Sequence, residues 1–256
     1  MLFDSHAHYD DSRFDRDREA LLASMQENGV DLIMNVGADM GSSKRSTVLA
    51  KRYPFVYAAV GVHPHEVKSM NEGDLQTLRE LSTLPKVCAI GEIGLDYYYD
   101  NSPRDLQKQW FVRQIELALE LEKPIIIHER DAHGDCMDIL RRYDFSGRGG
   151  VMHCFSGSVE MAKEIIKMGL VISIAGPVTF KNAKMLHRVA AEVPMDKILI
   201  ETDCPYLTPE PNRGQRNSSL NVRYVAQKIA DLREISIEEV ARASMENAKN
   251  LFGITD

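Results

Sequence analysis

Five of the eight histidines in this chain stand where a short apolar run gives way to polar residues. The first two form the pair His6-Ala7-His8, directly behind the apolar residues 2–3. Residues two apart on an extended strand point to the same side, so both imidazoles would enter one small volume. Imidazoles that converge beside further histidines or carboxylates make a divalent-metal site. A lone His-x-His pair can also be just two polar residues near an N-terminus. Whether it belongs to a metal site therefore depends on the rest of the chain.

The same arrangement recurs behind later apolar runs, where residues able to bind metal follow at once. Random placement would rarely produce this pattern, and a core histidine explains one such position but not the set. His65 lies two residues beyond one of these positions. In chain order, the residues behind the later runs are His63, Glu92, His128, His153 and Asp203.

Eight apolar runs alternate with longer amphipathic stretches, which predicts parallel strands joined by helical crossovers. The runs are continuous and not alternating, as in a sheet covered on both faces. For 256 residues this favours one closed (β/α)8 barrel of the TIM type, spanning 1–256 as a single domain. A doubly wound open sheet is the alternative, but no Gly-x-Gly-x-x-Gly follows the first strand. The runs cover 2–3, 30–36, 55–60, 87–90, 125–127, 151–152, 170–174 and 198–200.

Such a barrel would gather the polar residues at the carboxyl ends of its strands, where barrel enzymes have their sites. Four histidines and two carboxylates are too many ligands for one closed tetrahedral ion. Two divalent ions bridged by a carboxylate would use them all and leave positions for water. Imidazole and carboxylate together suit Zn, Mn, Co or Fe(II), and tolerate Mg.

Composition narrows the class of protein further. The net charge of -7 does not indicate general nucleic-acid binding, so phosphate would have to be held by metal or by a few arginines. Four cysteines without a CxxC pattern are typical of a reduced, cytoplasmic protein. No segment approaches the roughly 20 apolar residues of a membrane span. The N-terminus lacks the features of a signal peptide, so we expect no membrane association.

These motifs together resemble one known family, the TatD-type metal-dependent deoxyribonucleases. The resemblance runs from residue 2 to about residue 252, with the motifs in the family's order. The family consists of (β/α)8 barrels within the amidohydrolase superfamily. The matching segments are DSHAHYD, GVHPH, GEIGLDYY, IIIHERDA, VMHCFSGS and LIETDCPYLTP followed by RGQRN.

The resemblance implies a binuclear centre in which Glu92 bridges the two ions. It assigns His6, His8, Glu92 and Asp203 to one ion, and Glu92, His128 and His153 to the other. It also implies hydrolysis of phosphodiester bonds by a metal-activated water, as a deoxyribonuclease or exonuclease acting on DNA ends. Asp203 would hold that water and take its proton, so Asp203 and Glu92 are the expected catalytic residues.

Four further residues are candidates for binding the substrate. His63 would hydrogen-bond its phosphate, although the GVHPH turn could use it structurally. Arg213 and Arg216 could clamp an anion, since arginine binds phosphate in a bidentate manner, or lie in an ordinary solvated loop. Arg130, two residues after His128, has the same two interpretations.

Two more features remain open at this stage. Glu201 either orients a ligating histidine or is a salt-bridged carboxylate of the barrel. The tyrosines at 97–99 either stack on a base or pack over the barrel mouth.

Two other functions compete with a nuclease. The first is another amidohydrolase-superfamily reaction, on a small phosphoester or a C–N bond, because the metal ligands do not encode the leaving group. The second is a non-catalytic quality-control binding partner built on a degenerate barrel, against which the intact ligand set argues. We expect single-stranded DNA or DNA ends as substrate. The oligomeric state stays open and is compatible with a monomer.

Overall fold

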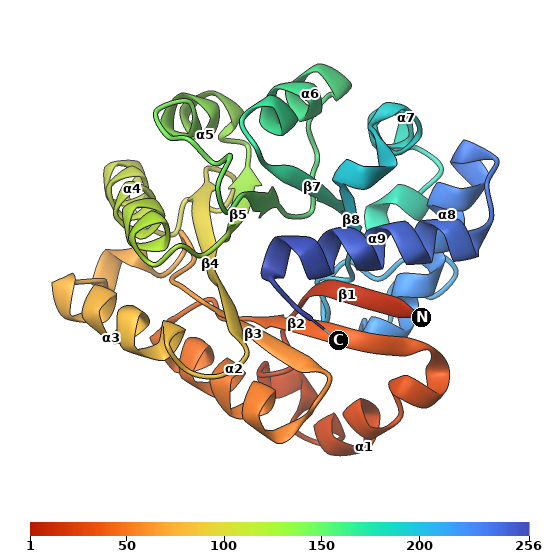
Figure 1. Ribbon diagram of the computed structural model, residues 1–256, viewed down its shortest axis with the longest axis horizontal. Coiled ribbons are helices and arrows are strands. Elements are labelled where there is room, and N and C mark those ends of the chain that lie inside the picture. The colour runs from red at the N-terminus through yellow and green to blue at the C-terminus, as the bar shows by residue number, and fades with distance from the viewer. Residues whose placement is uncertain (256) are drawn as a thin grey trace.

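Eight parallel strands follow one another around a nearly closed barrel in the order β1 to β8, which confirms the predicted (β/α)8 fold (Figure 1). The computed structural model describes residues 1–255. The strands are β1 Leu2–Ala7, β2 Val30–Val36, β3 Val56–Val60, β4 Val87–Asp96, β5 Ile125–Arg130, β6 Gly150–Met152, β7 Val171–Ile174 and β8 Ile198–Ile200.

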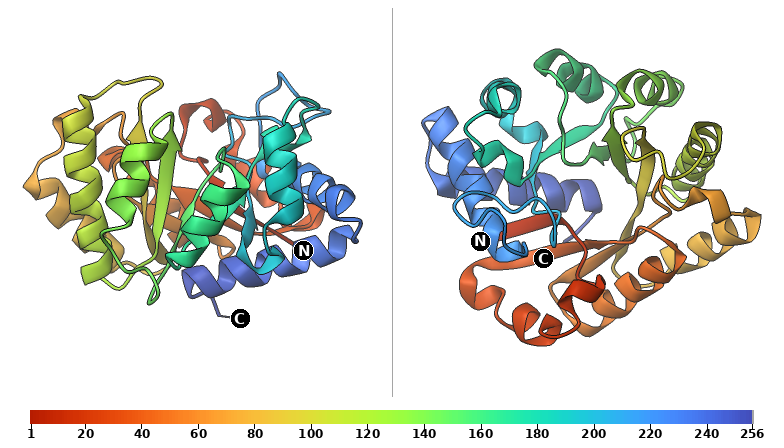
Figure 2. Two further views of the ribbon diagram at one scale, coloured as in Figure 1. Left: turned by 90° about the horizontal axis from the view of Figure 1, so that it is seen from above. Right: turned by 180° about the vertical axis from the view of Figure 1, so that it is seen from behind.

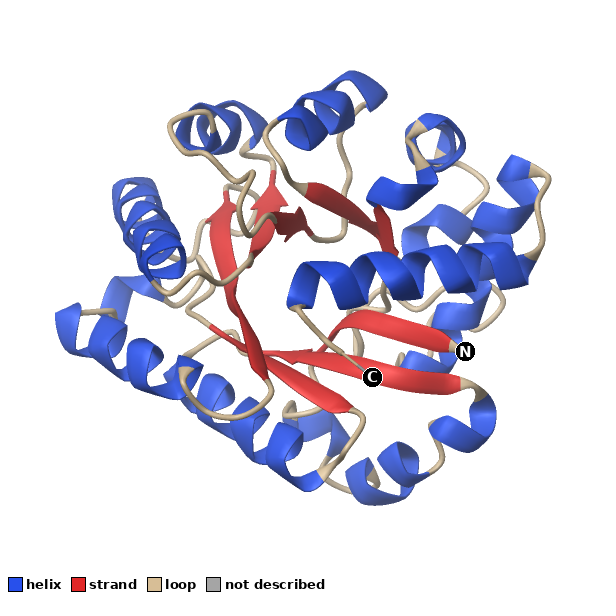
Figure 3. Ribbon diagram, viewed as in Figure 1, coloured by secondary structure: helices blue, strands red, loops and turns tan. Residues whose placement is uncertain are grey.

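Helices surround these strands, as Figure 3 shows in blue around red. The hydrophobic side chains of the strands and the facing helices form one continuous core between the two layers. The helices are α1 Arg18–Ala23, α2 Met40–Arg52, α3 Glu72–Ser82, α4 Arg104–Glu120, α5 His133–Leu140, α6 Val159–Lys167, α7 Lys184–Glu192, α8 Val222–Arg233 and α9 Ile237–Phe252.

The first and last strands meet through their carboxyl ends. The N–H of Asp203 donates to the carbonyl of His6 over 2.9 Å, and the N–H of His8 donates to the carbonyl of Cys204 over 2.8 Å. A parallel bridge joins Ala7 to Cys204. The contacts that close the barrel therefore run through the residues that we expect to bind metal.

A second, smaller core fills the interior of the barrel and is sealed by the last helix. Phe3, Met34 and Ile126 belong to it, together with Phe252 from α9. The left view of Figure 2 shows α9 along one end of the barrel, with the loops that follow the strands at the opposite end. The packed end supplies stability and leaves the other end free for chemistry.

The helical pattern of residues 15–28 predicts a single first helix, and this prediction is wrong. The structure has the short helix α1 between two single 3-10 turns, Ser12–Phe14 and Gln26–Asn28. The hydroxyl of Ser24 bonds the carbonyl of Leu21, which offers the backbone an alternative to further helix.

Several strand ends also differ from the prediction. His6, Glu92 and His128 lie within β1, β4 and β5 and not behind them. The reason is that the pairing of β4 with β5 continues as far as Asp96 and Arg130, well beyond the apolar runs. Ser236 and Glu239 have the spacing of a capping box, and the structure confirms it at the start of α9, with Ser236 as N-cap and Glu239 as its partner.

Among residues 1–255 the structure has no helix long and apolar enough to cross a membrane.

Candidate metal centre

A cavity of about 1220 Å³ opens at the carboxyl ends of the strands. Side chains that can bind metal line it from β4, β5 and the segments after β1, β3, β6 and β8. The six residues expected as ligands converge at its floor, linked by the contacts described next. They are His6, His8, Glu92, His128, His153 and Asp203.

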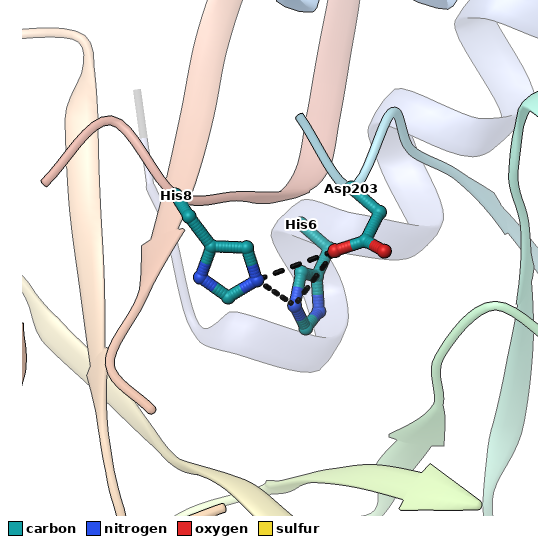
Figure 4. Close-up of side chains that lie close together, drawn as sticks. All are labelled: His6, His8 and Asp203. Carbon is teal, nitrogen blue, oxygen red and sulfur yellow. Dashed lines mark hydrogen bonds and ion pairs between the residues drawn. The ribbon is translucent and has the colours of Figure 1, made fainter. Parts of the chain in front are cut away.

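One half of this group joins the first strand to the last. The Nε2 atoms of His6 and His8 lie 3.1 Å apart. Oδ1 of Asp203 lies 3.2 Å from Nε2 of His8 and 3.8 Å from Nε2 of His6. In Figure 4 this oxygen faces both imidazoles, whereas the second carboxylate oxygen points away from them. Asp203 has a positive φ of 55°, a conformation that aspartate tolerates better than most residues.

Glu92 connects this half to the other through its two different oxygens. Its Oε2 lies 3.4 Å from Nε2 of His6 and 3.8 Å from Nε2 of His8. Its Oε1 lies 2.8 Å from both Nδ1 of His128 and Nε2 of His153. One buried carboxylate thus presents one oxygen to each pair of histidines.

The spacing of the donor atoms fits metal coordination. Four donors at about 2.0–2.2 Å from one ion would stand roughly 3.3–3.6 Å apart in a tetrahedron. In the first half, Nε2 of His6, Nε2 of His8, Oδ1 of Asp203 and Oε2 of Glu92 are the four donor atoms, and the five distances that involve a histidine nitrogen are 3.1–3.8 Å. In the second half, the 3.3 Å between Nδ1 of His128 and Nε2 of His153 also fits, whereas the two distances of 2.8 Å to Oε1 are those of hydrogen bonds.

The outer ring nitrogens support the same interpretation. A neutral imidazole has one N–H donor and one lone pair, and the partner of one nitrogen fixes the role of the other. Nδ1 of His8 lies 2.8 Å from the carbonyl oxygen of Val36, so Nδ1 donates and Nε2 keeps its lone pair toward the site. Within residues 1–255 Nδ1 of His153 has no hydrogen-bond partner, but it lies 3.3 Å from Oε1 of Glu201, whose negative charge favours a proton on that nitrogen.

This contact favours the first of the two interpretations of Glu201, a partner that orients a histidine. Glu201 is buried and also accepts hydrogen bonds from the N–H of Cys154 and the hydroxyl of Ser173. Carboxylates in this position hold a ligating imidazole in its tautomer and orientation.

Electrostatics at the floor of the cavity favour ionised carboxylates. Burial by itself raises the pKa of Glu92, but the imidazoles of His153, His63 and His6 hold it well below its usual range. Burial opposes the charged form of His8, yet Asp203 raises the pKa of that imidazole to about 9. Without a cation, the negative charge of the carboxylates therefore favours a protonated His8 imidazole. A bound divalent ion would supply the positive charge instead and displace that proton.

His63 differs from the other histidines of the site. The backbone N–H of His65 donates to its Nδ1 over 3.1 Å, so a neutral ring must have its proton on Nε2. Burial and the nearby His128 hold the pKa of His63 well below its usual value, which keeps the ring neutral. Its Nε2 lies 3.5 Å from Oε1 of Glu92. His63 is thus a hydrogen-bond donor at the edge of the centre.

Of the three arginines expected to bind substrate, the structure brings one to the cavity. Arg130 lines it, with its guanidinium 4.0 Å from the ring centre of Tyr98 and 4.8 Å from that of Tyr99. Within residues 1–255 this guanidinium pairs with no carboxylate. A guanidinium that is held by stacking on aromatic rings and whose N–H groups have no carboxylate partner can bind an anion.

Arg213 and Arg216 do not line the cavity, contrary to the expected clamp. Arg216 forms a bidentate ion pair with Asp17, at 2.6 and 2.8 Å. Arg213 packs over the ring of Phe180 and lies 3.9 Å from Glu210. Sequence spacing could not reveal these partners, because Asp17 is distant in the chain and only the folded loop brings it close.

The sequence analysis overlooked Asp96. This buried carboxylate lies 3.1 Å from Nε2 of His128 and 2.9 Å from Nε2 of His65. One signal was present, since Asp96 is four residues after Glu92 and residues at even spacing share one face of a strand. That signal requires the strand to continue beyond its apolar run.

Comparison with known proteins places this arrangement in a family. A model described as TatD related DNase matches residues 3–253. The chain belongs to this TatD family. As the resemblance implied, the protein is therefore a TatD-family metal-dependent hydrolase.

TatD-family relatives match the chain along its whole length. It is 49% identical to "uncharacterized metal-dependent hydrolase YabD" of Bacillus subtilis, over 99% of this chain and 100% of that one. It is 33% identical to "3'-5' ssDNA/RNA exonuclease TatD" of Shigella flexneri, over 99% of both chains. The crystal structure of YjjV, a TatD homologue from Escherichia coli, superposes with a TM-score of 0.93 at 31% identity, covering 99% and 98% of the two chains.

Proposed function

We propose that this protein hydrolyses phosphodiester bonds of nucleic acid, as a nuclease on single-stranded DNA or DNA ends that uses two divalent cations. The observation that supports this most directly is Glu92, which presents Oε2 to His6 and His8 and Oε1 to His128 and His153. A buried carboxylate with a separate nitrogen pair at each oxygen is suited to bridge two ions. Phosphodiester hydrolysis is a reaction that two bridged ions support.

The donor set assigns ligands to each ion. His6, His8, Asp203 and Oε2 of Glu92 would hold one ion. His128, His153 and Oε1 of Glu92 would hold the other. Imidazole and carboxylate suit Zn, Mn, Co or Fe(II), and tolerate Mg. Bound there, the ions would acidify water and offset charge on the phosphate oxygens.

The chain's own groups supply the remaining steps. The oxygen of Asp203 that points away from the two imidazoles would accept the proton of an attacking water. The Nε2–H of His63 donates to a phosphate oxygen, and the guanidinium of Arg130 binds the anionic backbone of the strand. Tyr98 and Tyr99, both more than half exposed, offer faces on which an unpaired base can stack.

The nature of this rim favours single strands over tight duplex binding. Stacking requires bases that are not paired, and one free arginine supplies little of the charge that duplex binding needs. The name of the Shigella flexneri relative, a 3'-5' exonuclease of single-stranded DNA and RNA, agrees with this substrate class.

The test is a cleavage assay with purified protein and Mn²⁺ on single-stranded DNA labelled at the 5′ or the 3′ end. We expect nucleotides to be released from one end, and a chelator to stop the reaction. The Asp203→Asn variant serves as the inactive control for a contaminating nuclease.

Two parallel assays address the competing functions. A dinucleotide, a small phosphoester and cyclic amides are offered under the same conditions. Turnover of an amide or a small phosphoester without any DNA cleavage would refute the nuclease function and favour another reaction of the amidohydrolase superfamily. Protein that binds no metal and turns over no substrate would instead indicate a binding partner.

A further inference from the structure

Asp96 uses both carboxylate oxygens, each with two donors. Its Oδ2 lies 3.1 Å from Nε2 of His128 and 2.9 Å from Nε2 of His65. Its Oδ1 accepts the backbone N–H groups of Tyr98 and Tyr99, over 3.0 and 2.8 Å. The side chain is fully buried, so its four acceptor sites are filled by protein and not by solvent.

The backbone of Asp96 is held as firmly as its side chain. Oε1 of the buried Gln107 on α4 accepts the N–H of Asp96 over 2.8 Å. Nε2 of the same amide donates to the carbonyl oxygen of Asp96 over 3.1 Å. The carboxylate therefore has a fixed position from which to orient its neighbours.

For His128 the consequence is a defined tautomer. Nδ1 lies 2.8 Å from Oε1 of Glu92 and Nε2 lies 3.1 Å from Oδ2 of Asp96, so both nitrogens face a carboxylate. With a cation at Nδ1, the single proton of the neutral ring stands on Nε2, where Asp96 accepts it. An anionic partner on the outer nitrogen also makes the inner nitrogen a more basic ligand. Asp96 thus accepts the N–H of the outer ring nitrogen of His128, as the carbonyl of Val36 does for His8.

The same carboxylate shapes the rim of the cavity. By accepting the N–H groups of Tyr98 and Tyr99, it fixes the turn that presents both rings. The guanidinium of Arg130 stacks on these rings, and the ring of Tyr99 meets His65 edge-on at 5.3 Å.

We propose that Asp96 is a positioning residue that couples two parts of the site: the orientation of His128 at the metal centre and the Tyr98–Tyr99 turn at the rim. This inference rests on the proposed function for the role of His128 as a ligand. It extends that function by joining metal affinity and substrate contact in one buried carboxylate.

A third cation between His63, His65 and Asp96 would be the other use of this cluster, whose ligand atoms lie within 4.8 Å of one another. The hydrogen bonds argue against it. Nδ1 of His63 accepts the N–H of His65, which leaves a proton and not a lone pair on Nε2. All acceptor sites of Asp96 are likewise occupied.

The first experiment titrates chelator-treated, full-length protein with Mn²⁺ by calorimetry. In Asp96→Asn the amide would face two imidazole N–H groups with its own donor, and His128 would lose its inward lone pair. We expect one of two binding equilibria to weaken by about 10–100-fold and the other to change little. The matched control is Asp135→Asn, a partly exposed carboxylate on α5 that contacts Tyr97 and Lys108, and it keeps both affinities.

The second experiment needs no variant, in case Asp96→Asn does not fold. Imidazole ¹⁵N spectra of the Zn²⁺-loaded wild type should show His128 protonated on Nε2. Protonation on Nδ1, or wild-type affinities in a folded Asp96→Asn variant, would overturn the proposal. A third ion that disappears in Asp96→Asn would make Asp96 itself a ligand and refute it as well.

Neither measurement uses nucleic acid. A wild type that shows the expected tautomer and affinities but cleaves no phosphodiester would therefore refute the proposed function and leave the role of Asp96 standing.

Discussion

The backbone N–H of Asp203 donates a hydrogen bond of 2.9 Å to the backbone carbonyl of His6. This bond joins the end of the last strand to the first, and the side chains of the same two residues face the same proposed ion site. Barrel closure and assembly of the metal centre are therefore one structural event. A substitution at the site should be judged for its effect on folding as well as on turnover.

Asp203→Asn separates these two effects, because the backbone bond to His6 does not need the carboxylate. We expect the melting temperature to change little while kcat falls by at least about 10²–10⁴, the usual contribution of a general base. Steady-state cleavage and thermal unfolding measure the two quantities. The exposed Asp138→Asn on α5 should change neither. Wild-type-like activity in Asp203→Asn would remove its assigned role.

Glu92→Gln should disrupt both ion sites at once. Glutamine keeps the shape but offers one oxygen and one N–H donor where two anionic oxygens face two nitrogen pairs. We expect the wild type to hold two Mn²⁺ ions per chain by elemental analysis after dialysis, and the variant to hold fewer than one. A variant that still retains two ions would show that Glu92 is not the bridge.

Metal should also stabilise the wild-type fold. An ion at 100 times its dissociation constant adds about 2.7 kcal/mol per site when only the folded state binds it. For a chain of this size that corresponds to a rise of roughly 5–11 °C in melting temperature. Scanning calorimetry with Mn²⁺ or with chelator tests this, and equal melting temperatures would contradict a preformed ion site.

Substitutions of Arg130 and Arg216 should affect KM differently, although the sequence made both arginines candidates for binding substrate. Losing a charged hydrogen bond costs about 1.5–3 kcal/mol, so Arg130→Ala should raise KM for single-stranded DNA roughly 10–100-fold. Arg216→Ala removes an ion pair with Asp17 outside the cavity and should change KM less than about threefold. Equal effects of the two substitutions would argue against Arg130 as the phosphate contact.

Phe252→Ala tests the helix that seals the other end of the barrel. Phe252 is buried and its ring centre lies 6.1 Å from that of Phe3. Truncation of a buried phenylalanine costs about 3–5 kcal/mol. We expect a clear loss of stability in urea with kcat preserved at 25 °C, because the site lies at the opposite end. Leu84→Ala, an exposed position, is the neutral control.

Much of the fold follows from local sequence. Continuous apolar runs alternating with amphipathic segments specify parallel strands and covering helices, and eight repeats fit one closed barrel. The candidate metal ligands could be recognised too, because the residues at the carboxyl ends of all strands lie at the same end of a barrel. The first helix was mispredicted because Ser24 offers its backbone a local alternative that periodicity does not register.

By itself, the sequence determined which residue types stand at the strand ends, and hence that the protein would bind divalent metal in a barrel of the TatD family. Only the tertiary structure decided which oxygen of Glu92 faces which pair of histidines. It also decided that Arg130 stacks on tyrosines at the cavity while Arg216 pairs with Asp17, and that Asp96 contacts His128. The physical reason is that these relationships join distant chain positions. They depend on strand register and loop conformation, which hydrophobic periodicity does not encode.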